Sequence, residues 1–260
     1  MSALLELRNI GISFGGLRAV DELSFSVKQG QIVGLIGPNG AGKTTVFNLI
    51  TGVYRPSDGD ILWRGQRITG ARPYRIAALG IRRTFQTIRL FPEMSVFENV
   101  RAGCHLRARQ HWWQGVLGLP AQRREEAALA EQTHAVLRCL RLDHLADEPA
   151  TSLAYGLQRR VELARTLVAD PTLVILDEPA AGLNDAESAA LNETILAVRG
   201  SGITVLLVEH DMNVVMKVSD YIVVLNFGRL IAAGDAASIR GDPAVIEAYL
   251  GRDDETEDLA

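Results

Sequence analysis

Apolar residues at the start of the chain fall into short runs that are separated by turns. The runs have the length of β-strands and comprise Leu4–Leu7, Ser24–Val27, Ile32–Ile36 and Asp60–Trp63. The turns between them carry glycine and proline signals, at Gly15-Gly16, Gln29-Gly30 and Pro56-Ser57-Asp58-Gly59. Because such runs and turns are typical of strands, this part of the chain is predicted to be mainly β-structure.

Helical spacing replaces this pattern from about Ser95 to Ala169, with Arg123–Leu140 as the longest example. Beyond it, apolar runs alternate with amphipathic segments, in the order Leu173–Leu176, Asp185–Val198, Thr204–Val208, Met212–Val218 and Tyr221–Leu225. Buried strands that alternate with helices are typical of a parallel sheet covered on both faces. The helical middle is therefore predicted to be an insertion between two halves of that sheet.

The composition is typical of a globular protein. The 260 residues are 47% apolar and 22% charged. No apolar run reaches the roughly 18–20 residues that a membrane helix needs. The segment Met1–Asn9 contains Glu6 and lacks an apolar core, so no export signal is expected. We therefore expect a cytosolic protein that reaches a membrane only through partners, with a frayed acidic tail at Asp253–Asp258.

The charged residues and cysteines narrow the possible ligands. The net charge is −4 without a basic block, which argues against nucleic acid as the main ligand. Lysine occurs only at Lys28, Lys43 and Lys217. The two cysteines, Cys104 and Cys139, lack the spacing of metal ligands and fit a reducing compartment.

Residues 37–44 match the phosphate-loop pattern G-x-x-x-x-G-K-[ST]. They are Gly37, Pro38, Asn39, Gly40, Ala41, Gly42, Lys43 and Thr44. The glycines allow the loop to surround the phosphates closely, with its backbone N–H groups pointing inward. A helix that begins near Lys43 adds the positive end of its dipole. Lys43 is predicted to reach the β- and γ-phosphates, and the Thr44 hydroxyl to ligate Mg²⁺. The strand Gln31–Ile36 before the loop and the apolar-periodic Thr45–Ile50 after it favour this over a chance glycine-rich turn.

Two later strands end in polar groups. Leu173–Leu176 is followed by Asp177 and Glu178, at the edge where ligands bind in open α/β sheets. Asp177 is predicted to hold Mg²⁺, and Glu178 to orient and deprotonate the attacking water. The alternative for this pair, taken on its own, is a solvated strand end. His210 follows the strand Val205–Val208 and is predicted to contact the γ-phosphate and the water.

Gln86 lies where the first half of the sheet gives way to the helical insertion. A glutamine at this place can sense the γ-phosphate, Mg²⁺ or water and report to the insertion. We therefore predict Gln86 to be a metal ligand and a member of the catalytic group.

With these motifs in order, the chain resembles an ABC-transporter ATP-binding subunit over essentially its whole length. The matching segments are Gly37–Thr45 (Walker A), Gln86 (Q-loop), Leu153–Gln158 (signature), Leu173–Glu178 (Walker B), Ala181–Asp185 (D-loop) and His210 (switch). The resemblance implies ATP and Mg²⁺ as cofactors and ATP hydrolysis coupled to transport. It also implies that Thr45 joins the nucleotide-binding loop and that Phe14 stacks on adenine. The alternative for Phe14 is a core phenylalanine.

The resemblance implies an α/β fold: a P-loop NTPase (RecA-like) core with an antiparallel β layer and an inserted α-helical subdomain. Residues 1–88 and 168–250 are predicted to form the core with its β layer, 89–167 the helical subdomain, and 251–260 the acidic tail. Two such domains are expected to sandwich two ATP molecules head to tail.

A finer resemblance is to the LivG-type ATP-binding subunits of branched-chain amino-acid importers. It is carried by Arg83–Gln86, Arg89–Phe91, Leu153–Gly156, Asp177–Asn184, Glu209–Met212 and Val245–Gly251. It implies import of branched-chain or other amino acids and two transmembrane permease subunits as partners. It further implies pairing with a paralogous ATP-binding subunit or with itself, and an indirect link to an extracytoplasmic solute-binding protein. The expected location is peripheral, at the cytoplasmic face of the inner membrane.

The signature segment departs from the wider family's Leu-Ser-Gly-Gly-Gln. Here it reads Leu153, Ala154, Tyr155, Gly156, Leu157. Ala154 lacks the hydroxyl that would reach the nucleotide of the neighbouring subunit, whereas the Gly156 N–H and a helix N-terminus remain. Ala154, Tyr155 and Gly156 are still predicted to contact that nucleotide. Because only this half-site is weakened, we predict an asymmetric working dimer with a related subunit.

Two other predictions concern partners. The segment from about Leu90 to Arg109 is predicted to dock on a membrane subunit, through an apolar cluster of Leu90, Phe91, Met94 and Phe97. The alternative is that these residues pack the helical lobe. Competing functions are a soluble ABC-type clamp on ribosomes or DNA and a P-loop kinase. The chain lacks the tandem duplication or coiled-coil insertion of such clamps, and its signature segment argues against a kinase.

Overall fold

The chain forms two compact units. The computed structural model describes residues 3–84, 88–106 and 120–250. The first unit, here the sheet unit, comprises Met1–Arg83, Thr172–Gly182 and Ile195–Ala260, and the second, the helical unit, comprises Thr84–Pro171 and Leu183–Thr194. These limits differ from the predicted domain boundaries, because residues 84–88, 168–171 and 183–194 group with the helical unit.

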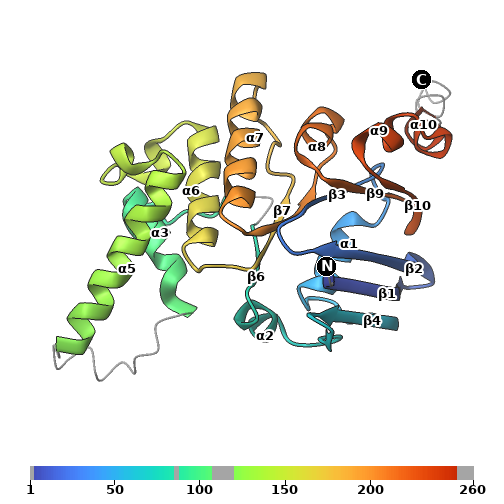
Figure 1. Ribbon diagram of the computed structural model, residues 1–260, viewed down its shortest axis with the longest axis horizontal. Coiled ribbons are helices and arrows are strands. Elements are labelled where there is room, and N and C mark those ends of the chain that lie inside the picture. The colour runs from blue at the N-terminus through green and yellow to red at the C-terminus, as the bar shows by residue number, and fades with distance from the viewer. Residues whose placement is uncertain (1–2, 85–87, 107–119, 251–260) are drawn as a thin grey trace. The chain divides into compact units, whose positions relative to one another are not determined.

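An antiparallel sheet forms one layer of the sheet unit (Figure 1). Its strands are β1 (Ala3–Phe14), β2 (Leu17–Lys28), β4 (Asp58–Trp63) and β5 (Gln66–Arg67), in the order β2-β1-β4-β5. β1 and β2 are joined by Gly15 and Gly16, with φ values of 51° and 91°. Such a two-residue turn needs positive φ, which glycine adopts without steric cost.

The second sheet contains the predicted parallel strands and two further edge strands. Its strands are β3 (Ile32–Ile36), β6 (Ile81–Arg83), β7 (Leu173–Asp177), β8 (Thr204–Val208), β9 (Tyr221–Asn226) and β10 (Arg229–Gly234). Their order is β10-β9-β3-β8-β7-β6, and every neighbouring pair is parallel except β9 and β10. All residues of β3, β7 and β8 are buried, as expected for strands covered on both faces. Their carboxyl ends therefore meet at one edge.

The helices of the sheet unit follow its strands. They are α1 (Lys43–Ile50), α2 (Pro73–Ala78), α8 (Met212–Val218), α9 (Ala236–Arg240) and α10 (Pro243–Leu250). The apolar face of α1 shares one core with residues of both sheets, and Figure 1 shows α1 between them. The helix α7 (Asp185–Gly200) has its first part in the helical unit and its last part in the sheet unit.

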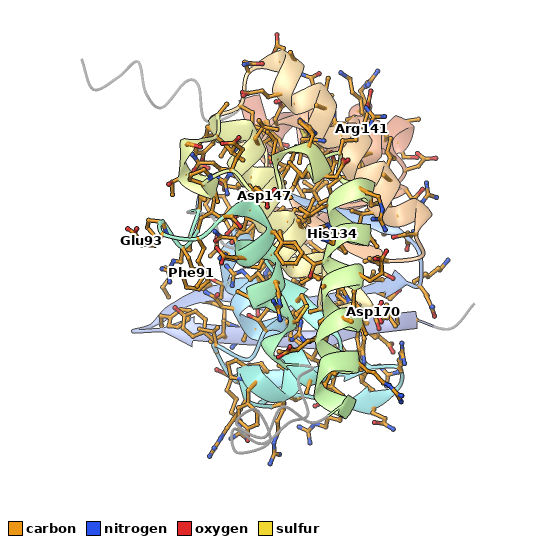
Figure 2. The ribbon with its side chains drawn as sticks, turned by 90° about the vertical axis from the view of Figure 1, so that its left-hand side faces the viewer. Phe91, Glu93, His134, Arg141, Asp147 and Asp170 are labelled. Atoms are coloured by element: carbon orange, nitrogen blue, oxygen red, sulfur yellow. The ribbon has the colours of Figure 1, made fainter. Side chains whose placement is uncertain are left out.

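The helical unit confirms the predicted helical middle. Its elements are α3 (Val96–Arg101), α5 (Pro120–Cys139) and α6 (Tyr155–Leu167), with the short 3₁₀ segments η1 (Ala102–Leu106), η2 (Asp143–Leu145) and η3 (Ala150–Ser152). Figure 2 shows this unit with His134 on α5. The rings of Phe97 on α3 and His134 lie 4.8 Å apart. Over the described ranges, no helix combines the length and apolar character needed to cross a membrane.

Candidate nucleotide site

An open cavity of about 390 Å³ lies in the sheet unit, beside the phosphate-loop pattern. Its described lining residues come from the start of β2, the loop before α1, the end of β7 and the β9–β10 turn. They are Leu17, Arg18, Ala19, Asn39, Gly40, Ala41, Gly42, Lys43, Thr44, Thr45, Glu178 and Phe227. The cavity thus brings together residues that lie far apart in the sequence.

The loop between β3 and α1 requires its glycines. At Gly37, with φ 151°, a Cβ atom would lie 2.1 Å from the carbonyl oxygen of Leu225. At Gly42, with φ 99°, it would lie 2.6 Å from the carbonyl oxygen of Ala19. Any side chain at either place would force neighbouring backbone apart. The loop is therefore pressed against β2 and β9, and the helix α1 begins directly after it at Lys43.

Lys43 is buried, and its ammonium group folds back onto the loop. Its Nζ donates hydrogen bonds to the carbonyl oxygens of Gly37, at 2.6 Å, and Pro38, at 3.0 Å. Both acceptors are neutral, whereas a phosphate oxygen carries charge and forms a stronger, charge-assisted hydrogen bond. Lys43 is therefore held beside the cavity by partners that an anion can replace.

Asp177 is buried at the last position of β7 and is paired with a cation. Its Oδ2 accepts a hydrogen bond of 2.7 Å from Nη2 of Arg83, at the end of β6. Nη1 of Arg83 donates at 2.7 Å to Oδ1 of Asn48, and its guanidinium lies 5.6 Å from the ring centre of Phe47. Sequence reasoning missed this role of Arg83, because its partners lie on distant segments.

Glu178 follows β7 in a strained backbone conformation. Its φ is 46°, in the left-handed region that side chains with a Cβ adopt rarely. Its N–H donates to the carbonyl oxygen of Val208 at 2.9 Å, and its carbonyl oxygen accepts from the N–H of Ala181 at 3.1 Å. These bonds hold the turn in place, and Glu178 lines the cavity. Strain of this kind is concentrated at functional sites.

The segments that follow β7 and β8 are tied together by Glu209, which sequence reasoning did not single out. Its carboxylate is completely buried; Oε1 accepts from the N–H of Ala180 at 2.6 Å and Oε2 from the N–H of His210 at 3.2 Å. Burial raises the pKa of Glu209, although the N–H donors partly offset this effect. Nδ1 of the exposed His210 lies 3.8 Å from Oε2 of Glu209. His210 is not among the described residues that line the cavity.

Phe14, the predicted adenine contact, is the last residue of β1. Phe14 is 43% exposed and packs edge-on against Tyr54, with ring centres 5.1 Å apart. It is not among the described lining residues of the cavity, so its contact with adenine stays a prediction. Gln86 lies outside the described residues.

The signature segment lies in the helical unit, at the start of α6. Ala154 is the N-cap residue and makes no side-chain capping hydrogen bond. Nε2 of Gln158 donates to the carbonyl oxygens of Leu153, at 2.8 Å, and Thr151, at 3.3 Å, which closes the loop before the helix. At Gly156 a Cβ atom would lie 2.9 Å from a carboxylate oxygen of Glu187. The predicted helix N-terminus is confirmed.

Comparison with known proteins identifies the family. A family model described as "ABC transporter" matches residues 20–181. The chain belongs to the ABC transporter family. A second model, described as "Branched-chain amino acid ATP-binding cassette transporter", matches residues 229–255. The predicted family and its P-loop fold are thereby confirmed, and membership implies that this ABC subunit uses ATP.

Similar proteins match over almost the full length of this ABC subunit. It is 45% identical to the high-affinity branched-chain amino acid transport ATP-binding protein BraF of Pseudomonas aeruginosa, over 95% of the chain and 98% of the relative. Identity and coverage are the same for LivG of Escherichia coli K12, which has the same descriptive name. A crystal structure of the ADP conformation of an ABC-transporter cassette, MJ1267, superposes with a TM-score of 0.85 at 32% identity. That match covers 96% of this chain and 100% of the other.

Proposed function

We propose that this chain hydrolyses ATP in its sheet unit and thereby energises an importer of branched-chain amino acids. One observation carries the enzymatic part of the proposal: the cavity is lined both by the phosphate-binding loop and by Glu178. A loop that cradles phosphates and a carboxylate beside it are the two parts that phosphoryl transfer to water requires.

The loop and its lysine bind and orient the phosphates. The backbone N–H groups of the loop and the N-terminus of α1 supply fixed positive dipoles. Lys43 adds a full positive charge when it exchanges its two carbonyl partners for phosphate oxygens. Because these groups are already in place, little reorganisation opposes charge development in the transition state.

Glu178 accepts the proton of the attacking water. The strained turn holds it at the cavity, next to a buried strand end. We assign His210 the role of orienting the same water and the γ-phosphate, with its loop fixed by the backbone hydrogen bond to Glu209. Gln86 keeps its predicted role as a sensor of this reaction.

The residues present fit a magnesium ion. Asp177 and the Thr44 hydroxyl would hold it, and bound Mg²⁺ would neutralise charge on the phosphates. In the described parts of the chain, no three His, Cys, Asp or Glu side chains are grouped as a complete metal site. Mg²⁺ usually takes one or two protein carboxylates and completes its shell with phosphate oxygens and water.

Glu178→Gln tests the enzymatic proposal. The amide is nearly isosteric but cannot take a proton, so ATP should still bind while turnover falls by about 10²- to 10⁴-fold. The matched control is Glu247→Gln, the same change at an exposed position on α10. Turnover of the Glu178 variant within twofold of the control would contradict the assignment.

The transported solute is proposed from similarity, because the relatives named above are branched-chain amino acid transport proteins. The test is the intact complex in vesicles, with ATP turnover measured as different solutes are supplied. Leucine, isoleucine and valine should stimulate turnover more than a polar amino acid or urea. Equal stimulation by urea would contradict this part of the proposal and leave the ATPase assignment untouched.

We propose that the turn before α3 docks on a membrane permease subunit, which makes the chain peripheral at the cytoplasmic face. Phe91 and Met94 are 47% and 38% exposed there. Asn99, fully buried, holds the turn: its Oδ1 accepts from the N–H of Phe91 at 2.8 Å, and its Nδ2 donates to the carbonyl oxygens of Phe91 and Met94, each at 3.1 Å. Figure 2 labels Phe91 and Glu93 in this turn. An exposed but rigid apolar turn suits a permanent interface.

Phe91→Asp tests this docking role, with Tyr74→Asp as the control at another exposed aromatic residue. The Phe91 variant should keep the ATPase activity of the isolated chain but assemble poorly with the permease subunits. Normal assembly and transport by this variant would exclude the docking role.

We also propose that the working pair is asymmetric, with a paralogous ATP-binding subunit as the partner. The chain's own phosphate site carries Lys43, Asp177 and Glu178, whereas the α6 terminus that it would offer to a neighbour lacks a hydroxyl at Ala154. The test compares ATPase rates of membrane complexes assembled with this chain alone and with both subunits. Full coupled activity of the homodimeric complex would contradict the asymmetric pairing.

A further inference from the structure

The carboxylate of Glu209 is completely buried and joins the segment that follows β7 to the segment that follows β8. The N–H groups of Ala180 and His210 donate to its two oxygens, at 2.6 Å and 3.2 Å. Burial raises the pKa of Glu209, and these N–H groups together with that of Asp211 partly offset the rise. The backbone therefore provides hydrogen bonds to this carboxylate but no full positive charge.

These hydrogen bonds alone do not require a charged side chain. A neutral hydroxyl or amide oxygen accepts from backbone N–H groups without the cost of burying an ionised carboxylate. In the described parts of the chain, the one side chain within ion-pair distance of Glu209 is His210, whose Nδ1 lies 3.8 Å from Oε2. The charge of Glu209 is therefore best explained by its effect on the imidazole ring.

The two side chains of this pair differ in exposure. The His210 side chain is 58% exposed, whereas that of Glu209 is 0% exposed. An anion beside Nδ1 favours the proton on this nitrogen and leaves Nε2, on the other side of the ring, to act on other groups. In the Ser-His-Asp arrangement, a buried carboxylate fixes the orientation and tautomer of the catalytic histidine in the same way.

Glu209 also connects His210 with the proposed catalytic base, Glu178. Its partner Ala180 lies two residues after Glu178, in a turn that the N–H of Ala181 closes by donating to the carbonyl oxygen of Glu178 at 3.1 Å. One buried carboxylate thus holds both the turn that carries the base and the backbone of the histidine.

We propose that Glu209 is a positioning residue for ATP hydrolysis, which holds the His210 ring with Nδ1–H toward its carboxylate and Nε2 toward the γ-phosphate and the attacking water. This inference rests on the proposed ATPase function and on the role assigned there to His210. Glu209 stays ionised throughout and stabilises positive charge on the ring while negative charge develops on the phosphate. The separation of 3.8 Å is longer than a hydrogen bond, and catalytic contacts that are long without substrate often shorten when it binds.

The kinetic test uses the assembled membrane complex with Glu209→Gln, His210→Ala and the double variant. Glu209→Gln should lower kcat about 10- to 100-fold, the usual loss when the partner that orients a functional histidine is removed, with KM for ATP within about threefold. His210→Ala should lower kcat at least as much, and the double variant should be no slower than His210→Ala. The control is Asp235→Asn, which also changes a carboxylate that accepts a backbone N–H, and its kcat should stay within about twofold.

A spectroscopic measurement separates positioning from support of the fold. Nitrogen NMR of the histidine-labelled full chain, without nucleotide, reports which ring nitrogen carries the proton, and the His210 signals are those missing in His210→Ala. The neutral His210 ring should carry its proton on Nδ1 in the unaltered chain. In Glu209→Gln the anion is absent, so the proton should move to Nε2.

The outcomes distinguish this inference from the function on which it rests. Losses that multiply in the double variant would overturn the inference, because Glu209 would then act independently of His210. The same tautomer in Glu209→Gln as in the unaltered chain, or a kcat within about twofold of the control, would overturn it as well. Failure of the unaltered complex to hydrolyse ATP would instead contradict the proposed function, whereas the tautomer measurement needs no nucleotide.

Discussion

Arg83 should stabilise the fold by compensating the buried charge of Asp177. The two side chains are 18% and 5% exposed and lie 2.7 Å apart. Removal of one partner from a buried ion pair leaves the other charge uncompensated and costs about 3–5 kcal/mol. Because Arg83 retains some exposure to water, we expect a loss near the lower end, about 3 kcal/mol. The suitable change is Arg83→Met, which keeps an apolar chain against Phe47.

The assay is urea unfolding of the isolated chain, with Arg67→Met as the matched control. Arg67 pairs with Asp60 at a similar distance of 2.5 Å, but the two side chains are 68% and 42% exposed. A surface pair of this kind contributes at most about 1 kcal/mol. Combining Arg83→Met with Asp177→Asn should recover much of the loss, because the stranded charge is removed.

The same prediction extends to the stabilisation of the chain by Mg²⁺ and ATP. With the counter-charge of Arg83 absent, Mg²⁺ and ATP should stabilise the Arg83→Met variant more than the unaltered chain. A ligand present at 100 times its dissociation constant stabilises a fold by about 2.7 kcal/mol, and each tenfold gain in affinity adds about 1.4 kcal/mol. The reasoning is refuted if Arg83→Met costs no more than Arg67→Met, or if Asp177→Asn recovers nothing.

Three further substitutions test other contacts. The pKa of the buried Glu209 is raised, so its ionisation above about pH 4.5 costs folding free energy in the unaltered chain, and this cost is absent below that pH. Glu209→Gln should therefore become more stable relative to the unaltered chain as the pH rises above about 4.5. Unfolding at several pH values measures this difference. Gly37→Ala should destabilise the chain by about 1 kcal/mol or more beyond Gly30→Ala. Both glycines have positive φ, but only at Gly37 would the new Cβ atom clash with backbone, at Leu225. Calorimetry of Gly37→Ala should also show that ATP binding is lost. Ala154→Ser should stabilise the chain by about 1 kcal/mol in urea unfolding, since α6 lacks a side-chain cap; an unchanged midpoint would contradict this.

The buried parallel strands could be predicted almost to the residue. Thr204–Val208 is identical to β8, and Leu173–Leu176 lacks only Asp177 of β7. Such strands are continuous apolar runs, so burial on both faces is visible in the sequence. The half-exposed hairpin was harder: Leu4–Leu7 and Ser24–Val27 were predicted, but β1 and β2 each have 12 residues. Exposed polar residues interrupt their apolar pattern.

Edge strands escaped sequence reasoning for a related reason. β6 consists of Ile81–Arg83 and has two arginines, and β10 consists of Arg229–Gly234 and has three exposed residues. β6 has only three residues, and β10, although six residues long, contains two alanines and a glycine, which are depleted in strands. The role of Arg83 depends on β6, so it could not be deduced without the fold.

The charged groups of the nucleotide site share one property that bears on how the site works. Lys43 is held by loop carbonyls, Asp177 by Arg83, and Glu209 by backbone N–H groups. Binding of phosphates and metal therefore means exchange of partners rather than the charging of an empty pocket. A metal held by Asp177 would compete with the guanidinium of Arg83, the last residue of β6. Arg83 precedes the predicted γ-phosphate sensor Gln86 by only three positions in the sequence. The same substitution that tests the ion pair, Arg83→Met, should therefore also reduce the coupling of ATP turnover to transport in the assembled complex.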